Sequence, residues 1–341
     1  MGNVLIALDQ GNSKIELVIA STMGHILARE RLTYPQIRNI EEFEKVRWRY
    51  IRDVFCKAML SLNKSNADIV CLLAAVCGAD CSEDCKEMQQ TLSETLCIKK
   101  EIITVINDSV AALHSVIPLD HVSTNLSVIY AGSMFNCSLL SHKGAMFTYG
   151  KSINIYDNGA YAIGQQVWSA VMDAYNGFSE PTILTSLFLQ YHKRESLKDL
   201  ISYFTTNRYI FTPSNYATIL FDAVRLKDKI AIEIMAYFAH RWSMYVSNGW
   251  SKIGVSKNEP KSIILAGGIF KNCGNLWVQM ISENISRNDK NAKVLLANTD
   301  PIAGALYLAL EQFNARPMPI EIIQNIYSSP LYSLLQVDYK K

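Results

Sequence analysis

Two carboxylates of the chain lie where they could act on a phosphate-bearing ligand. The first belongs to residues 9–14, DQGNSK, at the junction of two predicted strands. Gly11 and Asn12 favour a tight hairpin that exposes backbone N–H groups, and such a turn, with its hydroxyl and its lysine, can hold a phosphate. Asp9 at the strand end can hold a magnesium ion through water. A hairpin without any function would have the same residues, so the motif alone leaves both interpretations open.

The second carboxylate is Asp108, which follows Asn107 directly after the predicted buried strand 102–106. In α/β proteins, ligand groups gather at the carboxyl ends of strands. Asp108 could instead be only the N-cap of the helix that follows. Gly267 and Gly268 come after another predicted strand, where paired glycines let the backbone approach a flat ligand or simply serve the turn.

The elements that must position these residues follow one plan twice. A three-stranded meander is followed by alternating helices and strands, and the predicted segments of this first unit are strands 4–10, 15–21, 25–34, 69–76 and 102–106 and helices 40–62 and 83–96. The second unit repeats the meander from residue 125, and it continues with helix 159–175, a helical block over 181–249, strand 262–266, helix 272–285, strand 293–297 and helix 302–313. Alternating strands and helices imply parallel strands covered by helices. The repetition predicts a duplicated α/β fold with a ligand in the cleft between two lobes.

The composition excludes several other classes of protein. The 341 residues suit two domains, and the 49% hydrophobic and 19% charged residues suit a well-packed globule. A net charge of +2 gives no reason to expect nucleic acid as a partner. No apolar run approaches the roughly 20 residues of a membrane span, and the apolar N-terminal stretch is too short for a secretion signal. We therefore expect a cytoplasmic chain.

The eight cysteines leave one alternative open. Cys77, Cys81 and Cys85 lie close together and could suggest a metal or iron–sulfur site. No second group of Cys or His with ligand spacing completes a four-ligand shell. Free thiols in a reducing cytosol are the competing interpretation.

In this order, the motifs resemble those of N-acetylglucosamine kinase and its relatives, which are grouped with the BadF/BadG/BcrA/BcrD-type ATPases of the actin-like superfamily. The resemblance covers roughly residues 3 to 315 and rests on seven short motifs, at residues 9–14, 77–84, 107–113, 131–133, 157–164, 267–268 and 301–305. It implies a two-lobed, actin-like (ribonuclease H-like) ATPase fold. It also implies ATP and Mg²⁺ as cofactors, a small-molecule hydroxyl as phosphate acceptor, and a homodimer.

The resemblance also implies a role for individual positions. The first phosphate loop would comprise Asp9, Gly11, Asn12, Ser13 and Lys14. A second phosphate loop would use Gly132 and Ser133, and the adenosine would lie on Gly267 and Gly268 near Asn272. Asp108 would be the general base that takes the proton from the acceptor hydroxyl. The sugar-contacting positions would be Asn39, Gly78, Asn107, Gly150 and Asp157.

The lobes implied by the resemblance divide the chain into residues 1–117, completed by helix 300–315, and residues 118–299. The tail 316–341 lies outside the resemblance and has no assigned role.

Several positions depart from the pattern of the relatives. Ile15 stands where a second threonine is usual, Tyr130-Ala131 replaces Gly-Thr in the second phosphate loop, and Lys151 stands where tryptophan is common. In the segment 156–160, one carboxylate and one hydroxyl are lost. These changes suggest either a kinase with an unusual acceptor, such as an amino sugar, or a nucleotide- or sugar-binding regulator. The retained Asp108 favours the kinase.

A third hypothesis is an ATPase that activates a reductive dehydratase through a shared iron–sulfur cluster. Cys137 and Cys273 do not match the cysteine pattern of such activators.

Overall fold

The first sheet is built around a strand that is buried along its whole length. In the computed structural model, which describes residues 2–34, 40–116, 123, 125–207, 211–314 and 318–339, every residue of β1 (Val4–Gln10) is buried. Its partners in the sheet are β2 (Lys14–Ser21), β3 (Ile26–Thr33), β4 (Ile69–Val76) and β5 (Ile103–Asn107). The order is β3-β2-β1-β4-β5, with β1 antiparallel to β2 and parallel to β4. Continuous apolar strands of this kind require cover on both faces of the sheet.

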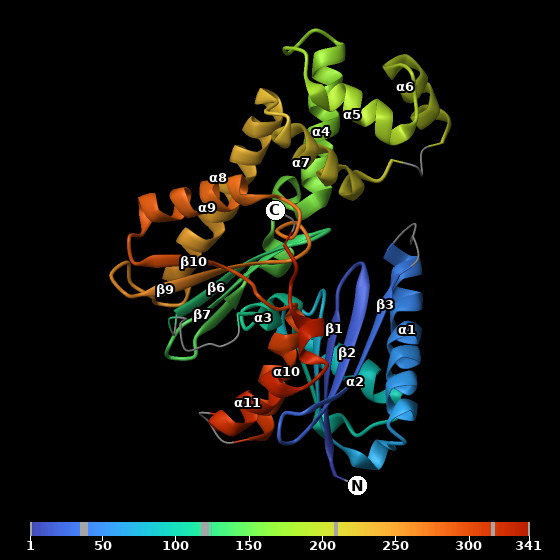
Figure 1. Cartoon of the computed structure of the whole chain (residues 1–341), viewed down its shortest axis with the longest axis vertical. Coiled ribbons are helices and arrows are strands. Elements are labelled where there is room, and N and C mark those ends of the chain that lie inside the picture. Colours follow the sequence, from blue (N-terminus) through green and yellow to red (C-terminus); the bar gives the residue numbers. More distant parts are fainter. Residues whose placement is uncertain are drawn as a thin grey trace.

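That cover comes from both ends of the chain (Figure 1). On one face the core includes residues of α1 (Ile40–Ser61) and α2 (Ser82–Leu96), and on the other it includes residues of α10 (Pro301–Phe313) and α11 (Ile320–Ser328). The tail, which had no assigned role, therefore belongs to the core of the first sheet. Ile322 of α11 is buried against Gly24 of the β2–β3 turn.

The second sheet repeats the pattern of the first. Its strands are β6 (Asn125–Ala131), β7 (Phe135–Leu140), β8 (Met146–Thr148), β9 (Lys261–Ala266) and β10 (Ala292–Leu296). The order is β10-β9-β6-β7-β8, with β6 antiparallel to β7 and parallel to β9. The predicted duplication of a meander followed by parallel strands is confirmed.

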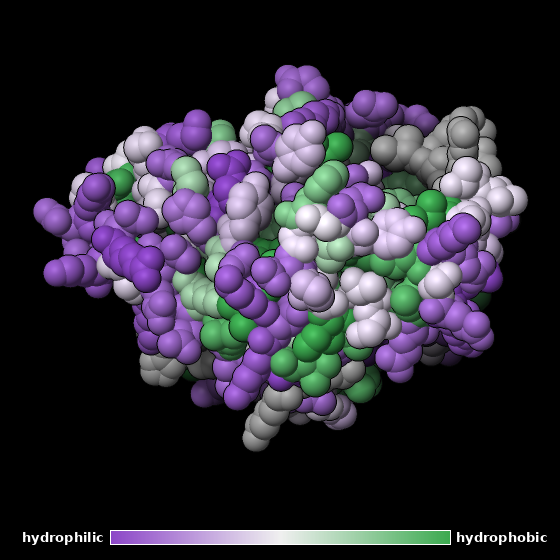
Figure 2. Space-filling view, turned by 90° about the horizontal axis from the view of Figure 1, so that it is seen from above, coloured by the Kyte–Doolittle hydropathy of each residue, from purple (hydrophilic) through white to green (hydrophobic). Residues whose placement is uncertain are grey.

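Helices from the middle of the chain cover the second sheet and extend beyond it. They are α4 (Gly159–Tyr175), α5 (Ile183–His192), α6 (Leu197–Thr206), α7 (Ala217–Arg225), α8 (Lys229–Lys252) and α9 (Asn275–Asn288). Two fully buried tryptophans, Trp242 and Trp277, stack with ring centroids 5.1 Å apart between α8 and α9. At the end of the molecule that carries α5 and α6 the surface is mostly hydrophilic, with hydrophobic patches in its lower middle (Figure 2). Within the described residues, we find no helix of sufficient length and apolarity for a membrane span.

Most predicted elements lie within a few residues of the observed ones. The predicted helix 159–175 coincides with α4, whereas the predicted helix 272–285 begins three residues later, at Asn275. The delay has a local cause, because Gly274 adopts a φ of +74° and breaks the chain direction before α9. The predicted boundary at 117/118 lies outside the described residues.

Within the first lobe α10 crosses α3 (Asp108–Ala112), the short helix that carries Asp108 and whose residue Ala112 packs against the second sheet. Gly304 of α10 faces the backbone of Ala111, and a Cβ atom at position 304 would lie 2.0 Å from its carbonyl oxygen. The crossing therefore requires a glycine, because backbone atoms cannot give way as a flexible side chain can.

We predict that Gly304→Ala lowers the free energy of unfolding by about 1–3 kcal/mol, the usual range for overpacking, although alanine favours helix. Chemical denaturation monitored by circular dichroism would measure the change. Gly132→Ala is the matched control, since a Cβ there would meet no atom within 4 Å. Equal stability of the two variants would contradict the close crossing of α3 and α10.

Candidate functional site

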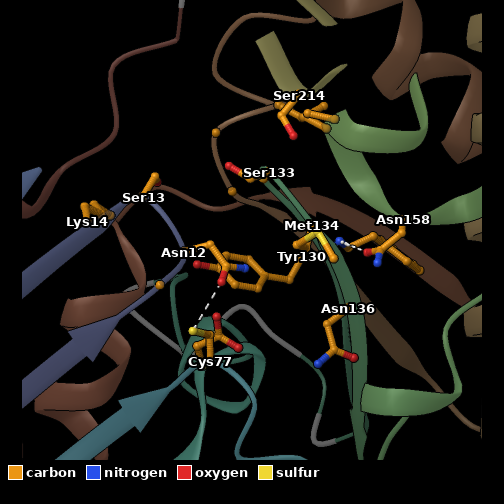
Figure 3. A pocket seen from close by; sticks show the side chains of 18 of the residues that line it. Asn12, Ser13, Lys14, Cys77, Tyr130, Ser133, Met134, Asn136, Asn158 and Ser214 are labelled. Atoms are coloured by element: carbon orange, nitrogen blue, oxygen red, sulfur yellow. Dashed lines mark hydrogen bonds between the residues drawn. The ribbon is translucent and has the colours of Figure 1, made fainter. Parts of the chain in front are cut away.

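A cavity of about 810 Å³ lies between the two sheets. Most of the predicted site residues line it, namely Gly11, Asn12, Ser13, Lys14, Gly78, Asp108, Gly132, Ser133, Gly150, Gly267, Gly268 and Asn272. Figure 3 shows how labelled side chains of both lobes approach this space, among them Ser13 and Lys14 from the β1–β2 hairpin and Ser133 from the β6–β7 turn. The structure thus brings together motifs that are more than 250 residues apart in the sequence.

The β1–β2 hairpin forms the first wall of the cavity. Its turn is closed by a hydrogen bond from the Gly11 N–H to the Lys14 carbonyl, 3.0 Å long. The Lys14 ammonium lies 2.8 Å from a carboxylate oxygen of Glu16, and 3.8 and 3.9 Å from those of Asp9 and Asp300. Burial lowers the pKa of Lys14, but the three carboxylates raise it by more, so the pKa of Lys14 lies above its ordinary value. Lys14 is therefore a fixed cation at the cavity wall.

Asp9 lies behind this wall rather than in it. Its side chain is 1% exposed, and its Oδ1 has no hydrogen-bond partner among the described residues. Burial raises the pKa of Asp9 to about 6, with Glu16 and Asp300 adding to the rise and Lys14 opposing it. A buried carboxylate oxygen without a partner suits a hydrated magnesium ion, which carboxylates and phosphates commonly hold together.

Asp108 lies at the first position of α3 and faces the cavity. The alternative interpretation as helix N-cap is wrong, because Asn107 is the N-cap and its side chain accepts a hydrogen bond from the Ser109 N–H. Burial raises the pKa of Asp108 to about 8, and the charges of Asp9 and Asp80 add to the rise. The Ser109 N–H, 3.0 Å from Asp108 Oδ1, acts in the opposite direction. This carboxyl group is therefore poised to exchange a proton near neutral pH.

The second wall comes from the β6–β7 turn and the glycine pair. Gly132 and Ser133 accept hydrogen bonds from the backbone at the start of α4, at 3.0 and 3.1 Å. Gly267 adopts a φ of +105°, and a Cβ on it would lie 2.3 Å from the carbonyl oxygen of Ala131. The glycine pair therefore lies directly against the β6–β7 turn, the segment predicted to be the second phosphate loop.

Tyr130, one of the departures from the family pattern, also lines the cavity. Burial raises the pKa of its hydroxyl, and the nearby charges of Asp9 and Asp108 raise it further. The phenol therefore stays neutral and adds a hydroxyl beside the two acids.

Two predicted sugar-contacting residues do not line the cavity. Asn107 and Asp157 do not line the cavity in the described part of the chain, and Asn39 lies outside the described residues. Asp157 is fully buried in the second lobe, where Arg241 donates to both of its carboxylate oxygens, at 2.9 and 2.6 Å, and the Tyr245 hydroxyl donates at 2.9 Å. Its hydrogen-bonding capacity is used to hold α8 against the segment before α4. Asn107 instead supports Asp80, which does line the cavity.

The sequence interpretation missed several polar residues of the cavity. They are Arg31, Glu44, Arg47, Asp80, Asn136, Lys151, Lys271 and Asp300. Asp300 had a usable signal, because an Asp-Pro pair at the start of a predicted helix marks an N-cap. Burial raises its pKa, yet Lys14 and Lys271 hold the net value below normal. Asn136 had no usable signal in the sequence, because its place in the cavity depends on the pairing of β6 with β7.

The three clustered cysteines differ in their exposure to solvent. Cys77 is buried and within hydrogen-bonding distance of Gln10 and Asn12, whereas Cys81 is exposed and Cys85 is half-buried. Throughout the ranges that the structure describes, no group of three or more His, Cys, Asp or Glu side chains is arranged to hold a metal ion.

Comparisons with known proteins agree with this architecture. The N-acetyl-D-glucosamine kinase of Dictyostelium discoideum is 26% identical over 164 residues, which are 48% of this chain and 51% of that protein. The chain thus matches about half the length of this relative. A solved structure from Chromobacterium violaceum, of a protein proposed to be an N-acetylglucosamine kinase, covers 91% of this chain and 99% of its own at 14% identity, with a TM-score of 0.66.

A ROK family glucokinase from Streptomyces griseus, solved with glucose and AMPPNP, covers 90% of this chain and 98% of its own, with 14% identity and a TM-score of 0.56. At these identities the two solved structures show the fold alone, and they confirm the predicted two-lobed, actin-like architecture. The model of the BadF/BadG/BcrA/BcrD ATPase family matches residues 6–309. Because that match spans most of the sequence, the chain belongs to the BadF/BadG/BcrA/BcrD ATPase family.

Proposed function

We propose that the protein is an ATP-dependent kinase that transfers the terminal phosphate to a hydroxyl group of a sugar, an amino sugar or a similar small molecule. The observation that carries this proposal is the position of Asp108. Its carboxyl group faces a cavity whose other walls are two phosphate-type loops and a glycine pair. A base, phosphate-holding backbone and a cleft between two lobes are the components that phosphoryl transfer needs. Family membership and the sugar-kinase relatives support the same reaction.

In the proposed reaction, the Asp108 carboxylate takes the proton of the acceptor hydroxyl. The acceptor oxygen then forms a bond to the terminal phosphorus, and the bond between that phosphorus and the bridging oxygen breaks. ADP leaves with the electron pair of the broken bond. Backbone N–H groups of the β1–β2 hairpin and the Lys14 ammonium would hold the negative phosphates during transfer.

Magnesium fits the residues around Asp9. Asp9 offers a buried carboxylate oxygen without a partner, and Asp300 adds a second buried carboxylate nearby. When bound, the ion would neutralise part of the phosphate charge.

A binding regulator is the alternative from a different class. A regulator would bind its ligand in the same cavity without transferring phosphate. On this hypothesis, the loss of the Asp108 base has no functional consequence. Asp108 gives the reason to prefer the kinase, since Asn107 already caps α3 and no helix-capping role accounts for the buried acid.

We expect Asp108→Asn to lower kcat/KM for the acceptor by about 10²–10⁴-fold, the usual contribution of general base catalysis. Nucleotide affinity should change little, because the base acts on the acceptor. Phosphorylated product, detected by mass spectrometry in a panel of sugars and amino sugars with ATP and magnesium, gives the rate. Asp53→Asn, on the exposed face of α1, is the control. Undiminished transfer by Asp108→Asn would remove Asp108 from the mechanism.

The raised pKa of Asp108 predicts a pH dependence of both activity and stability. A base must be deprotonated, so kcat/KM should rise with pH and level off above about 8. For stability, a carboxyl whose folded pKa exceeds its unfolded pKa stabilises the fold at low pH, and this contribution is lost as pH rises through about 8. Asp108→Asn should therefore raise the melting temperature more at pH 9 than at pH 6. A pH-independent difference, equal to that of Asp53→Asn, would contradict the buried-charge assignment.

A further inference from the structure

One end of the cavity, which we call the acceptor pocket, has more carboxylates than cationic side chains. It is the end lined by Glu44, Arg47, Asp80, Asp108, Gly150 and Lys151. The two cations of the pocket are both engaged. Arg47 pairs with Glu44 at 2.9 Å and lies over the Trp48 ring, while Lys151 pairs with Asp84 at 2.7 Å.

Asp80, like the proposed base Asp108, lacks a cationic partner at ion-pair distance among the described residues. Its Oδ1 accepts a hydrogen bond from the Asn107 side chain at 2.8 Å, and no hydrogen bond is formed by its Oδ2 within the same part of the chain. The residue is half-buried. Burial raises the pKa of Asp80 and the charge of Asp84 adds to the rise, while the charge of Lys151 and the hydrogen bond from Asn107 oppose it without reversing it.

The position of Asp80 is fixed by the second lobe. A Cβ on Gly150 would lie 2.6 Å from the Asp80 Cβ, so the backbone at Gly150 packs directly on the Asp80 side chain. The Gly150 N–H in turn donates to Asn136 Oδ1 at 3.0 Å, and the Asn136 side chain donates to Asn107 Oδ1 at 3.2 Å. The end of β5, the start of β7 and the segment after β8 thus hold one carboxylate at the wall of the cavity, next to the residue that precedes Asp108.

We propose that the phosphate acceptor carries an ammonium group, and that the Asp80 carboxylate binds this group while the hydroxyl to be phosphorylated faces Asp108. This inference rests on the proposed kinase function and narrows its substrate class to amine-bearing sugars or cyclitols. A half-buried carboxylate without a cation costs free energy, and a charge-assisted hydrogen bond from the ligand removes that cost. An acetylated amine has lost its positive charge and gives only a neutral hydrogen bond. Sugar acids would be repelled by the net negative charge of the pocket.

The test compares sets of substrates that differ in a single group. Each set contains the amine, the N-acetyl and the hydroxyl form of the same sugar, substituted at carbon 2, 3 or 6, together with the matching uronic acid. The wild-type protein with ATP and magnesium should show kcat/KM about 10- to 100-fold higher for the amine than for the hydroxyl form in at least one set, as hydrogen bonds to charged groups provide. Asp80→Asn should abolish that preference, so that the amine and hydroxyl forms react with kcat/KM values within about threefold of each other.

Each outcome bears on a different claim. Equal or better rates with the hydroxyl or N-acetyl form in every set would overturn the ammonium proposal and leave the kinase in place. A preference for the uronic acid would also overturn it and assign selection to Arg47. Absence of phosphorylated product from every compound would instead remove the kinase function, and this inference with it. The wild-type comparison needs no variant, so it stands even if Asp80→Asn fails to fold, and Asp53→Asn controls for a surface charge change.

Discussion

The structure depends on a group of carboxylates buried where the two lobes meet. Asp9, Glu16 and Asp300 are each less than 5% exposed, and all three lie within 4 Å of the Lys14 ammonium. Arg29 also pairs with Glu16, and Lys271 also pairs with Asp300. Burying such a network of charges is unfavourable, because the attraction between the ions has to offset their desolvation. Folding overcomes this cost through the apolar cores on both faces of the first sheet. Asp9 keeps one carboxylate oxygen without a hydrogen-bond partner among the described residues, and a divalent cation held together with a polyphosphate would satisfy it.

The duplicated fold explains how these acids come together. Asp9 is near the end of β1, Asp108 follows the end of β5, and Asp300 precedes α10, so each lies near an element boundary; Asp108 and Asp300 line the cleft, with Asp9 directly behind its wall. Parallel strands place their carboxyl ends at one edge of a sheet, which is why ligand groups gather there. The two sheets present these edges to the same cavity. Neither lobe alone would contain both the β1–β2 hairpin and the β6–β7 turn.

The sequence was sufficient for the elements and for motifs within turns, because both depend on local patterns. The β1–β2 hairpin and the glycine pair could be placed from their own residues. Asp80 and Asn136 could not, because their place in the cavity depends on the packing of Gly150 and on the β6–β7 register. Asp157 was assigned to the sugar by resemblance, yet its position is set by Arg241, which lies 84 residues away in the sequence. Such long-range partners leave no local signal.

The distribution of charge gives the cavity a direction. Lys14 and Lys271 line the cavity on the side of the β1–β2 hairpin, and each of them is paired with a carboxylate. In the acceptor pocket Arg47 and Lys151 are paired as well, whereas Asp80 has no ion pair among the described residues. A ligand pair with opposite charges, polyphosphate at one end and ammonium at the other, would satisfy both ends at once. The reverse arrangement would bring like charges together at each end. The reacting hydroxyl and the terminal phosphate would then meet beside Asp108.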